Sequence, residues 1–316
     1  MDIMSTKCPF CKSENTRSYL KLKDYFLSQE DFEIVECDNC KLLFTTPRPD
    51  KSVIGNYYKS DNYLSHNEHK KGLVPWIYNQ VKKVNIRNKF KIVCKDFTNA
   101  KLLDFGCGVG DFLHYAQQNG CEITGCDMSE DARKYASEKL SKTIVSPEEI
   151  FDLPHSTFDI ITMWHVLEHI DDLRFQTEQL HRLLKDNGRL VIAVPNYKSY
   201  DAQHYKDKWA AYDVPRHLNH FHKESLENIF AGNFELQEIY PMKWDAYYIS
   251  MMSEKYIGKG NSFIKGIITG WKSNHKARKT GEYSSLIYVF RKIWFLPIFR
   301  RFKTILILNN LVVKNF

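Results

Sequence analysis

Residues 101–120 read KLLDFGCGVGDFLHYAQQNG and contain the chain's clearest structural pattern. Mostly apolar side chains at 102–105 predict a short buried strand, and a helix is expected to begin near Asp111 and to stop at Gly120. Three glycines separate the strand from the helix, namely Gly106, Gly108 and Gly110. Glycines in such a turn let the backbone bend sharply and approach a ligand closely. The stretch therefore predicts a strand, a ligand-binding loop and a helix, in that order.

Two acidic residues indicate what the loop binds. The next expected strand, CEITGCDMS, ends at Asp127, which follows Asp104 by 23 residues. An acid at the tip of the second strand is placed to hold two ribose hydroxyls. The dinucleotide pattern G-x-G-x-x-G would need glycine at 111, where this chain has Asp111. Because Asp104 suits the ammonium of a methionine-like ligand better than a pyrophosphate, a dinucleotide is disfavoured.

The run DFGCGVG resembles the first motif, D-x-G-x-G-x-G, of the class I S-adenosylmethionine-dependent methyltransferases. The similarity continues through FDIITMWHVLEHIDD, with a fourth strand expected at 158–163. It also covers LHRLLKDNGRLVIAVPN, with a turn at Asn187-Gly188 and a fifth strand at 189–194. FELQEIY and YSSLIYVFRK match the last two strands, of which the second is inserted antiparallel in this family. The resemblance implies an α/β fold with a Rossmann-like, doubly wound sheet of seven strands.

The resemblance also implies an enzyme that uses S-adenosylmethionine as its cofactor. Asp104 is expected to face the amino end of this cofactor and Asp127 its ribose. Trp164 and His165, just past the fourth strand, are expected to border the methionine end, with packing as the alternative for His165. The expected cofactor-binding residues are Asp104, Gly106, Gly108, Gly110, Asp127, Met128, Trp164 and His165.

Four cysteines near the start form two Cys-x-x-Cys pairs, CPFC and CDNC, separated by 25 residues. Four thiolates complete a tetrahedral Zn²⁺ shell, and the two-residue spacer lets each pair hold the ion from a tight turn. The segments YLKLKDYF and FEIVEC between the pairs predict short strands. The sequence thus predicts a zinc ribbon with a closed, structural metal site, whereas chance pairing or disulfides would be the alternative. The expected ligands are Cys8, Cys11, Cys37 and Cys40.

The segment DVPRHLNHFHK, from Asp213, places three histidines close together after the fifth strand, at the edge where open α/β sheets bind ligands. It resembles a segment of a bacterial branch of the superfamily, W-x(2)-x-D-x-P-R-H-L-x-H-F. His217, ahead of His220, is expected as general base or hydrogen-bond partner of the acceptor, and Arg216 as the contact for an anionic group. Packing and helix capping are the alternative, and His222 is expected at the surface. A second metal site is disfavoured because no carboxylate beyond Asp213 stands beside the histidines.

Charge is unevenly distributed along the chain. The net charge is +7, but the part from Lys243 onward carries 14 Lys and Arg against 3 Asp and Glu, so the preceding part stands at −4. The tail at 292–316 is apolar and basic, and charged residues interrupt every run long enough to span a membrane. It is expected to lie at a membrane interface or to pack on the body or on a second subunit. Since the N-terminus lacks a secretory pattern, a cytoplasmic location with peripheral membrane contact is expected.

We divide the chain into a zinc ribbon at 1–46, a linker and leading helix at 47–99, a methyltransferase domain at 100–291 and the tail. The expected function is methyl transfer to a small-molecule or glycan acceptor, such as a sugar or lipid-linked saccharide of surface-polysaccharide biosynthesis. This expectation rests on a similar layout in bacterial enzymes that act on sugars. One alternative is a quinone-type small-molecule O-methyltransferase, which shares the LLKDNGRL region. The other is an RNA-modifying or RNA-binding protein, although the acidic body argues against nucleic acid as a partner.

Overall fold

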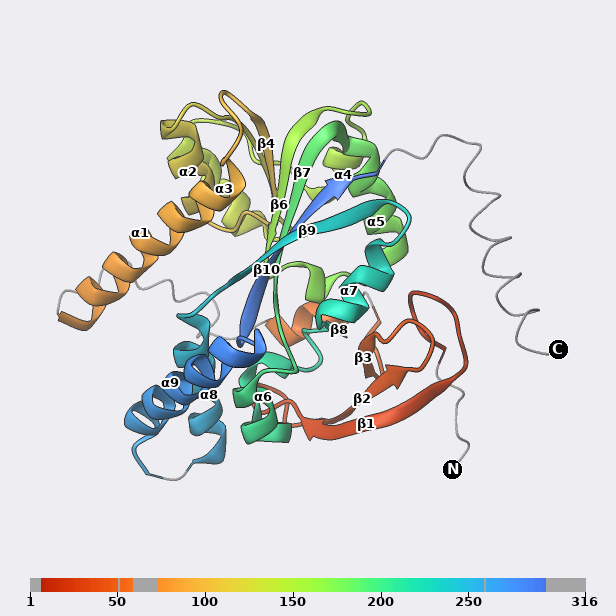
Figure 1. The fold of residues 1–316 in the computed structure, drawn as a ribbon, viewed down its shortest axis with the longest axis vertical. Helices are drawn as coiled ribbons and strands as arrows, with labels where there is room; N and C mark the ends of the chain where they lie inside the picture. Colours follow the sequence, from red (N-terminus) through yellow and green to blue (C-terminus); the bar gives the residue numbers. More distant parts are fainter. Residues whose placement is uncertain (1–6, 51, 59–72, 259, 294–316) are drawn as a thin grey trace.

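A computed structural model describes residues 7–50, 52–58, 73–258 and 260–293 of the chain. Two sheets organise the molecule (Figure 1). The larger sheet has the order β5-β4-β6-β7-β10-β9, and the smaller sheet the order β1-β2-β3-β8. The strands of the larger sheet are β4 (Lys101–Phe105), β5 (Glu122–Cys126), β6 (Phe158–Trp164), β7 (Leu184–Pro195), β9 (Phe234–Pro241) and β10 (Ser285–Lys292). Those of the smaller sheet are β1 (Thr16–Lys23), β2 (Asp31–Cys37), β3 (Leu43–Thr46) and β8 (Asn219–His220).

Helices cover both faces of the larger sheet, as Figure 1 shows. The α-helices are α1 (Leu73–Val93), α2 (Asp111–Gln118), α3 (Glu130–Leu140), α4 (Pro147–Phe151), α5 (Leu173–Leu183), α6 (Tyr200–Tyr205), α7 (Lys223–Phe230), α8 (Asp245–Ile257) and α9 (Ser262–Thr280). Short 3₁₀ turns occur at Ile54–Tyr58, Leu167–His169, Lys206–Lys208 and Ala210–Tyr212. Neighbouring strand residues point to opposite faces. Leu102 therefore packs with side chains of α2 and α3, and Leu103 with side chains of α5 and α7.

The strand directions confirm the expected Rossmann-like, doubly wound arrangement. β4, β5, β6 and β7 are parallel, whereas β10 runs antiparallel to both β7 and β9. The strands and helices expected from the glycine loop, from 158–163 and from the last two segments all form close to their expected bounds. The parallel strands are buried on both faces, which accounts for their nearly continuous apolar sequences.

Two details differ from expectation. The larger sheet has six strands within the described residues, not seven, because the segment after α3 makes only one bridge, between Cys126 and Val145. Ser146 and Glu149 form a capping box directly after it, and Pro147 starts α4, so the segment has no room to extend as a strand. The expected turn at Asn187-Gly188 lies inside β7, where the pairing with β6 shifts register instead of breaking.

The small sheet joins the cysteine-rich segment to the body. Its fourth strand, β8, comes from the histidine segment and pairs antiparallel with β3. Cys8, Cys37 and Phe44 lie in the same hydrophobic cluster as Phe221 and Leu226 of the body. The ribbon and the larger sheet therefore share one core.

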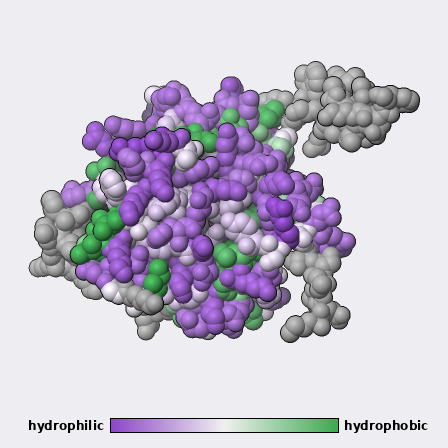
Figure 2. All heavy atoms as spheres, turned by 60° about the horizontal axis from the view of Figure 1, so that its bottom comes forward, coloured by the Kyte–Doolittle hydropathy of each residue, from purple (hydrophilic) through white to green (hydrophobic). Residues whose placement is uncertain are grey.

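Helix α9 has an unusual distribution of side chains. Its buried residues are small, namely Gly266, Thr269, Gly270, Ser273 and Ala277. A Cβ atom at Gly266 would lie 2.6 Å from the Cα of Met251, so the missing side chain lets α8 and α9 approach closely. The large apolar side chains face outward, namely Phe263, Ile264, Ile267, Ile268 and Trp271. Apolar surface shows as green toward the left of Figure 2, the side on which Figure 1 places α9.

No helix in the described part of the chain is long and apolar enough to cross a membrane. The tail at 292–316, expected at an interface or against the body, lies outside the described residues from 294 onward.

Candidate active site

The glycine loop between β4 and α2 has the tight backbone that its sequence predicts. Gly106, Gly108 and Gly110 all have positive φ, at 76°, 53° and 75°. A Cβ at Gly106 would lie 2.4 Å from Val166, and one at Gly110 would lie 3.0 Å from Leu140. A Cβ at Gly108 would meet nothing within 4 Å. Gly106 and Gly110 therefore allow close packing inside the protein, while Gly108 faces open space in which a ligand can lie.

Asp127 is fixed at the tip of β5, beside the loop. Its Oδ2 accepts a hydrogen bond from the backbone N–H of Gly108 at 2.8 Å, and its Oδ1 accepts one from the N–H of Ser129 at 2.9 Å. The next residue, Met128, is 75% exposed. The structure thus places one carboxylate across the ends of two adjacent strands, which is the position expected for a ribose contact.

Asp104 is buried at the end of β4. Thr162 of β6 donates a hydrogen bond to its carboxylate at 2.6 Å. Burial raises the pKa of Asp104 to about 7, although Thr162 and the ammonium group of Lys89 act in the opposite direction. A carboxyl group of this kind gains a strong preference for its charged form when a cation is placed beside it.

Lys89 is a site residue that the sequence reasoning missed. It lies on α1, and its Nζ is 4.2 Å from the centroid of the Trp164 ring. Burial lowers the pKa of Lys89, whereas the carboxylates of Asp245 and Asp104 act to raise it. The leading helix therefore contributes an amino group to the edge of the sheet. No motif marks this lysine, because only the packing of α1 brings it there.

Trp164 is the last residue of β6, which is one residue longer than the strand expected at 158–163, and His165 follows it directly. The indole N–H of Trp164 is buried and has no hydrogen-bond partner among the described residues. His165 has a left-handed backbone (φ 56°), and its Nε2 lies 3.1 Å from the carboxylate of Asp245. Burial alone would lower the pKa of His165, but Asp245 and Glu168 raise it to about 9. His165 is therefore a cation near neutral pH and not a free base.

The three histidines of the DVPRHLNHFHK segment separate in space. His220 is buried on β8, with its Nε2 2.9 Å from the hydroxyl of Thr45. His222 precedes α7, and its Nδ1 lies 2.7 Å from the hydroxyl of Tyr197. His217 alone lies with other reactive groups. Burial and the neighbouring imidazole of His169 lower the pKa of His217 to about 4.

His217 meets two residues from the turn after β6, Glu168 and His169. Their candidate ligand atoms lie within 4.8 Å of one another, and the two imidazole rings have centroids 4.7 Å apart. Along the sequence, Asp213 is the one carboxylate expected beside the histidines. The structure supplies one from 49 residues upstream, because Leu218 donates its backbone N–H to the carbonyl oxygen of Glu168 at 2.8 Å.

Arg216 has a different position from the one expected. It is 1% exposed, and its Nη2 lies 2.7 Å from Asp24 of the ribbon and 2.8 Å from Asp213. Its Nη1 also donates a hydrogen bond to the carbonyl oxygen of Tyr57 at 3.1 Å. Because protein groups already satisfy this guanidinium, it braces the ribbon against the body and offers no open position to an anionic substrate.

The four cysteines of the two Cys-x-x-Cys pairs come together as expected. Cys8 and Cys40 have their sulfur atoms 3.5 Å apart, and so do Cys11 and Cys37. All four sulfur atoms lie within 4.8 Å of one another. With Zn–S bonds of about 2.3 Å, a tetrahedral site needs sulfur atoms slightly under 4 Å apart, roughly the spacing of these pairs. The residues therefore fit a tetrahedral metal ion.

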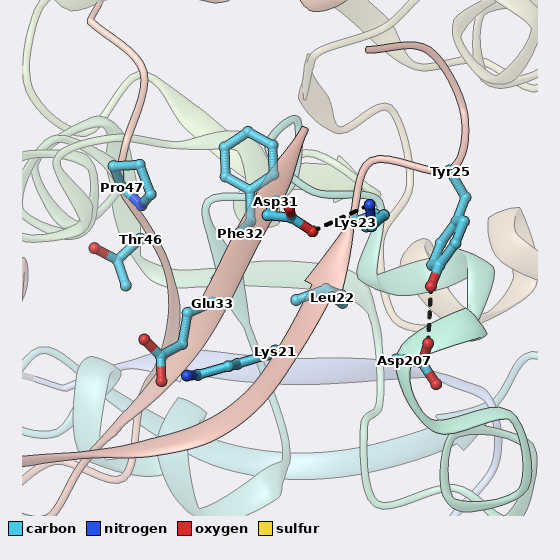
Figure 3. A pocket seen from close by; sticks show the side chains of 10 residues that line it. All are labelled: Lys21, Leu22, Lys23, Tyr25, Asp31, Phe32, Glu33, Thr46, Pro47 and Asp207. Atoms are coloured by element: carbon cyan, nitrogen blue, oxygen red, sulfur yellow. Dashed lines mark hydrogen bonds and ion pairs between the residues drawn. The ribbon is translucent and has the colours of Figure 1, made fainter. Parts of the chain in front are cut away.

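A separate hollow of about 490 Å³ is lined by ribbon residues and by Asp207 of the body (Figure 3). Lys21, Lys23 and Glu33 of β1 and β2 line it, and Tyr25 donates a hydrogen bond to Asp207 at its rim at 2.8 Å. None of the expected cofactor or metal residues is among its lining, so this hollow is distinct from the edge of the larger sheet.

Comparisons with known proteins match the methyltransferase part of the chain. Residues 79–238 match the model of a family described as a methyltransferase domain. The chain is 29% identical over 149 residues to a malonyl-[acyl-carrier protein] O-methyltransferase of Enterobacter lignolyticus, covering 44% of this chain and 57% of that protein. It is 36% identical over 129 residues to a ubiquinone biosynthesis O-methyltransferase of Pelagibacter ubique, covering 37% and 53%. The chain thus spans just over half the length of these curated relatives.

Solved structures of low sequence similarity align with much of the chain. One is a geranyl diphosphate C-methyltransferase of Streptomyces coelicolor, with 12% identity and a TM-score of 0.48, covering 78% of this chain and 90% of that one. This similarity is too low to carry an argument about activity. The family match is more informative, since it includes the glycine loop, Asp127, the turn after β6 and His217.

Proposed function

This chain belongs to the class I S-adenosylmethionine-dependent methyltransferases, and from this premise we propose that it methylates a hydroxyl oxygen of a small-molecule or glycan acceptor. The observation that carries the proposal is the position of two groups of residues at one edge of the sheet. The cofactor-side residues surround the glycine loop, and Glu168, His169 and His217 follow on the turn after β6. The O-methyltransferases among the relatives support oxygen as the methylated atom.

Each cofactor-side residue has a role that fits its position. When bound, the cofactor supplies an activated methyl group on a sulfonium. Asp127 holds the ribose hydroxyls, and Gly108 lets the backbone approach, because nothing occupies the space beside it. Asp104 takes the ammonium of the methionine end, and Met128, exposed beside Asp127, contacts the nucleoside.

The methionine end also carries a carboxylate, for which the site offers positive charge. The amino group of Lys89 reaches over Trp164, whereas both ring nitrogens of His165 are already paired with Asp245 and Glu168. Lys89 and Asp104 together match the opposite charges of an amino acid. This complementarity distinguishes a methionine-containing cofactor from a dinucleotide.

The acceptor hydroxyl binds at Glu168, His169 and His217. Positioning supplies much of the rate in such a transfer, because the donor is already activated. His217 holds its Nδ1 against the carbonyl oxygen of Ala211 at 2.9 Å, so its Nε2 is the nitrogen left for the acceptor side. His220 and Arg216 support this loop through their contacts with the ribbon and do not touch the acceptor.

Two classes of acceptor fit the proposal. A sugar or lipid-linked saccharide agrees with the combination of a cysteine ribbon and a methyltransferase domain. A quinone-type phenol is the second candidate, since the chain is 36% identical to a ubiquinone biosynthesis O-methyltransferase over 129 residues. The ribbon itself holds a structural Zn²⁺ on Cys8, Cys11, Cys37 and Cys40.

An anionic membrane surface fits the exposed face of α9. Ile264, Ile267, Ile268 and Trp271 form a stripe at helical spacing, and Lys272 and Lys279 on the same helix are also exposed. Apolar side chains beside basic ones are the pattern of a helix that lies on anionic lipid. Contact through α9 would bring the enzyme to a lipid-linked or quinone-type acceptor.

The acceptor class is tested with radiolabelled S-adenosylmethionine and two substrate panels, one of nucleotide sugars and lipid-linked saccharides and one of polyprenylated phenols. We expect label transfer to one panel, with loss of transfer in His217→Ala and retention in His155→Ala, which changes an exposed histidine before β6. Transfer to neither panel by a protein that binds the cofactor would contradict both acceptor classes.

A further inference from the structure

The turn after β6 and the histidine segment bring three metal-ligating side chains to one point. Glu168, His169 and His217 have ligand atoms within 4.8 Å of one another, and none belongs to the cysteine cluster. Two imidazoles and one carboxylate form a common donor set for catalytic divalent metals. Proximity alone does not define a metal site, because each donor atom must also have a lone pair available for the metal.

Backbone carbonyl groups fix both imidazole rings. The Nδ1 of His217 lies 2.9 Å from the carbonyl oxygen of Ala211, and the Nδ1 of His169 lies 2.9 Å from that of Arg216. A carbonyl oxygen can only accept a hydrogen bond, so each Nδ1 carries the proton. Each Nε2 therefore keeps its lone pair, and this is how metal-binding histidines are oriented in proteins.

Glu168 is buried with only one of its two carboxylate oxygens paired. It is 1% exposed, and its Oε1 lies 3.3 Å from the Nδ1 of His165, with which it forms an ion pair. Its Oε2 has no hydrogen-bond partner among the described residues. A buried carboxylate oxygen without a partner is costly unless another donor or a cation satisfies it.

Access to solvent is the last requirement. Glu168 is buried, whereas His169 and His217 each keep part of their surface exposed. Three protein ligands with an open position are typical of catalytic metal sites, whereas the four cysteines would form a closed one. A metal ion here would keep one or more positions for an outside oxygen ligand.

We propose that Glu168, His169 and His217 hold one divalent metal ion, which binds the acceptor hydroxyl and promotes loss of its proton. The inference rests on the proposed function for the identity of the acceptor, though not for the metal itself. The hydroxyl proton passes to solvent, and the acceptor oxygen then forms a bond to the methyl carbon. The bond from sulfur to that carbon breaks, and its electron pair stays on sulfur. The metal does not change its oxidation state.

Binding of Mn²⁺ to the zinc-loaded protein tests the site, with the free ion followed by electron paramagnetic resonance. Mn²⁺ prefers carboxylate and imidazole ligands and competes poorly for thiolates, so the cysteine cluster does not interfere. We expect one Mn²⁺ per chain, with affinity reduced about tenfold or more in Glu168→Gln and in His217→Gln. His155→Gln serves as the matched control and should bind as the wild type does.

Equal Mn²⁺ affinity in the wild type and both variants, or no binding to the wild type, would overturn the inference. Circular dichroism and thermal melting verify that each variant is folded, and His169→Gln replaces any variant that is not. Titration of S-adenosylmethionine into the same preparations separates the two claims. If the protein binds the cofactor but not Mn²⁺, only the metal-site proposal is contradicted. If it binds Mn²⁺ but not the cofactor, the proposed function is contradicted and the metal-site proposal is supported.

Discussion

At the scale of single residues, local pattern was enough to place Asp104, Asp127 and the three glycines. A strand, a tight turn and a helix bring these residues to one edge through contacts that are close in sequence. Lys89 and Glu168 could not be placed this way. Lys89 reaches the site only through the packing of α1, and Glu168 meets His217 across 49 residues of chain. Arg216 was expected to contact the acceptor, but it pairs with Asp24 of the ribbon, a residue far from it in the sequence.

Asp104 predicts a pH dependence of cofactor binding. Burial raises its pKa to about 7 in the free protein, so this group favours folding when protonated and its contribution is lost as the pH rises toward 7. The ammonium of the cofactor favours the charged carboxylate, so binding releases a proton below pH 7. Affinity should therefore increase between pH 5.5 and 7, by at most about tenfold per pH unit.

Isothermal titration at several pH values in buffers of different ionisation enthalpy measures both the affinity and the released proton. Asp104→Asn should bind the cofactor more weakly and with a flatter pH profile. An equally steep profile in this variant would assign the dependence to another group.

Gly106 and Gly108 predict different defects although both have positive φ. Alanine at either position costs about 1–2 kcal/mol of backbone strain. At Gly106 the new Cβ also meets Val166 at 2.4 Å, which adds about 1–3 kcal/mol for overpacking. At Gly108 the Cβ enters the space proposed for the cofactor.

Gly106→Ala should therefore lower the free energy of unfolding more than Gly108→Ala does, as measured by urea denaturation. Gly108→Ala should remain the more stable variant and lose about tenfold or more in cofactor affinity, which corresponds to about 1.4 kcal/mol. Normal cofactor binding by Gly108→Ala would place the cofactor elsewhere.

At the scale of elements, strands and helices with regular apolar spacing formed where the sequence predicts them. The failures have physical causes. The sheet has six strands in the described residues instead of the seven expected, because the capping box and Pro147 leave the segment after α3 with a single bridge. β8 has two residues and exists only through its pairing with β3, so no local pattern could reveal it. Helix α9 inverts the usual pattern, with small residues buried and large apolar residues exposed.

The exposed face of α9 predicts binding to anionic vesicles. Burial of an isoleucine side chain is worth about 1.5–3 kcal/mol, so the double variant Ile264→Glu with Ile268→Glu should bind at least about tenfold more weakly. Co-sedimentation with vesicles containing phosphatidylglycerol measures this, and Val84→Glu, at an exposed apolar position on α1, is the control. Failure of the wild-type protein to bind the vesicles would contradict the membrane proposal. So would a dimer that forms in the wild type and is lost in the double variant.

At the scale of the whole molecule, the ribbon and the α/β body form one structure. They share a hydrophobic cluster, a strand pair and the buried ion pair between Arg216 and Asp24. The sequence predicted the ribbon and the body separately, because each has its own motif. It contained no signal for their union, which depends on side chains that meet only after both have folded.

This union predicts that loss of the ribbon's metal destabilises the whole chain. Removal of Zn²⁺ by a strong chelator, or Cys37→Ser, should lower the melting temperature in a single cooperative transition. In the metal-loaded protein, metal binding contributes free energy to the folding of the shared core, and this contribution is lost with the metal. Differential scanning calorimetry and metal analysis check the result. Two separate transitions, with the body unaffected, would show that the ribbon folds independently.

The edge formed by Asp104, Gly108 and Asp127 is proposed to bind S-adenosylmethionine, and calorimetric titration of the purified protein measures this binding. We predict a single binding event in the wild type that is abolished or strongly weakened in Asp127→Ala, because the ribose loses its carboxylate partner. No heat with folded, metal-loaded wild-type protein, or equal binding by Asp127→Ala, would contradict the account.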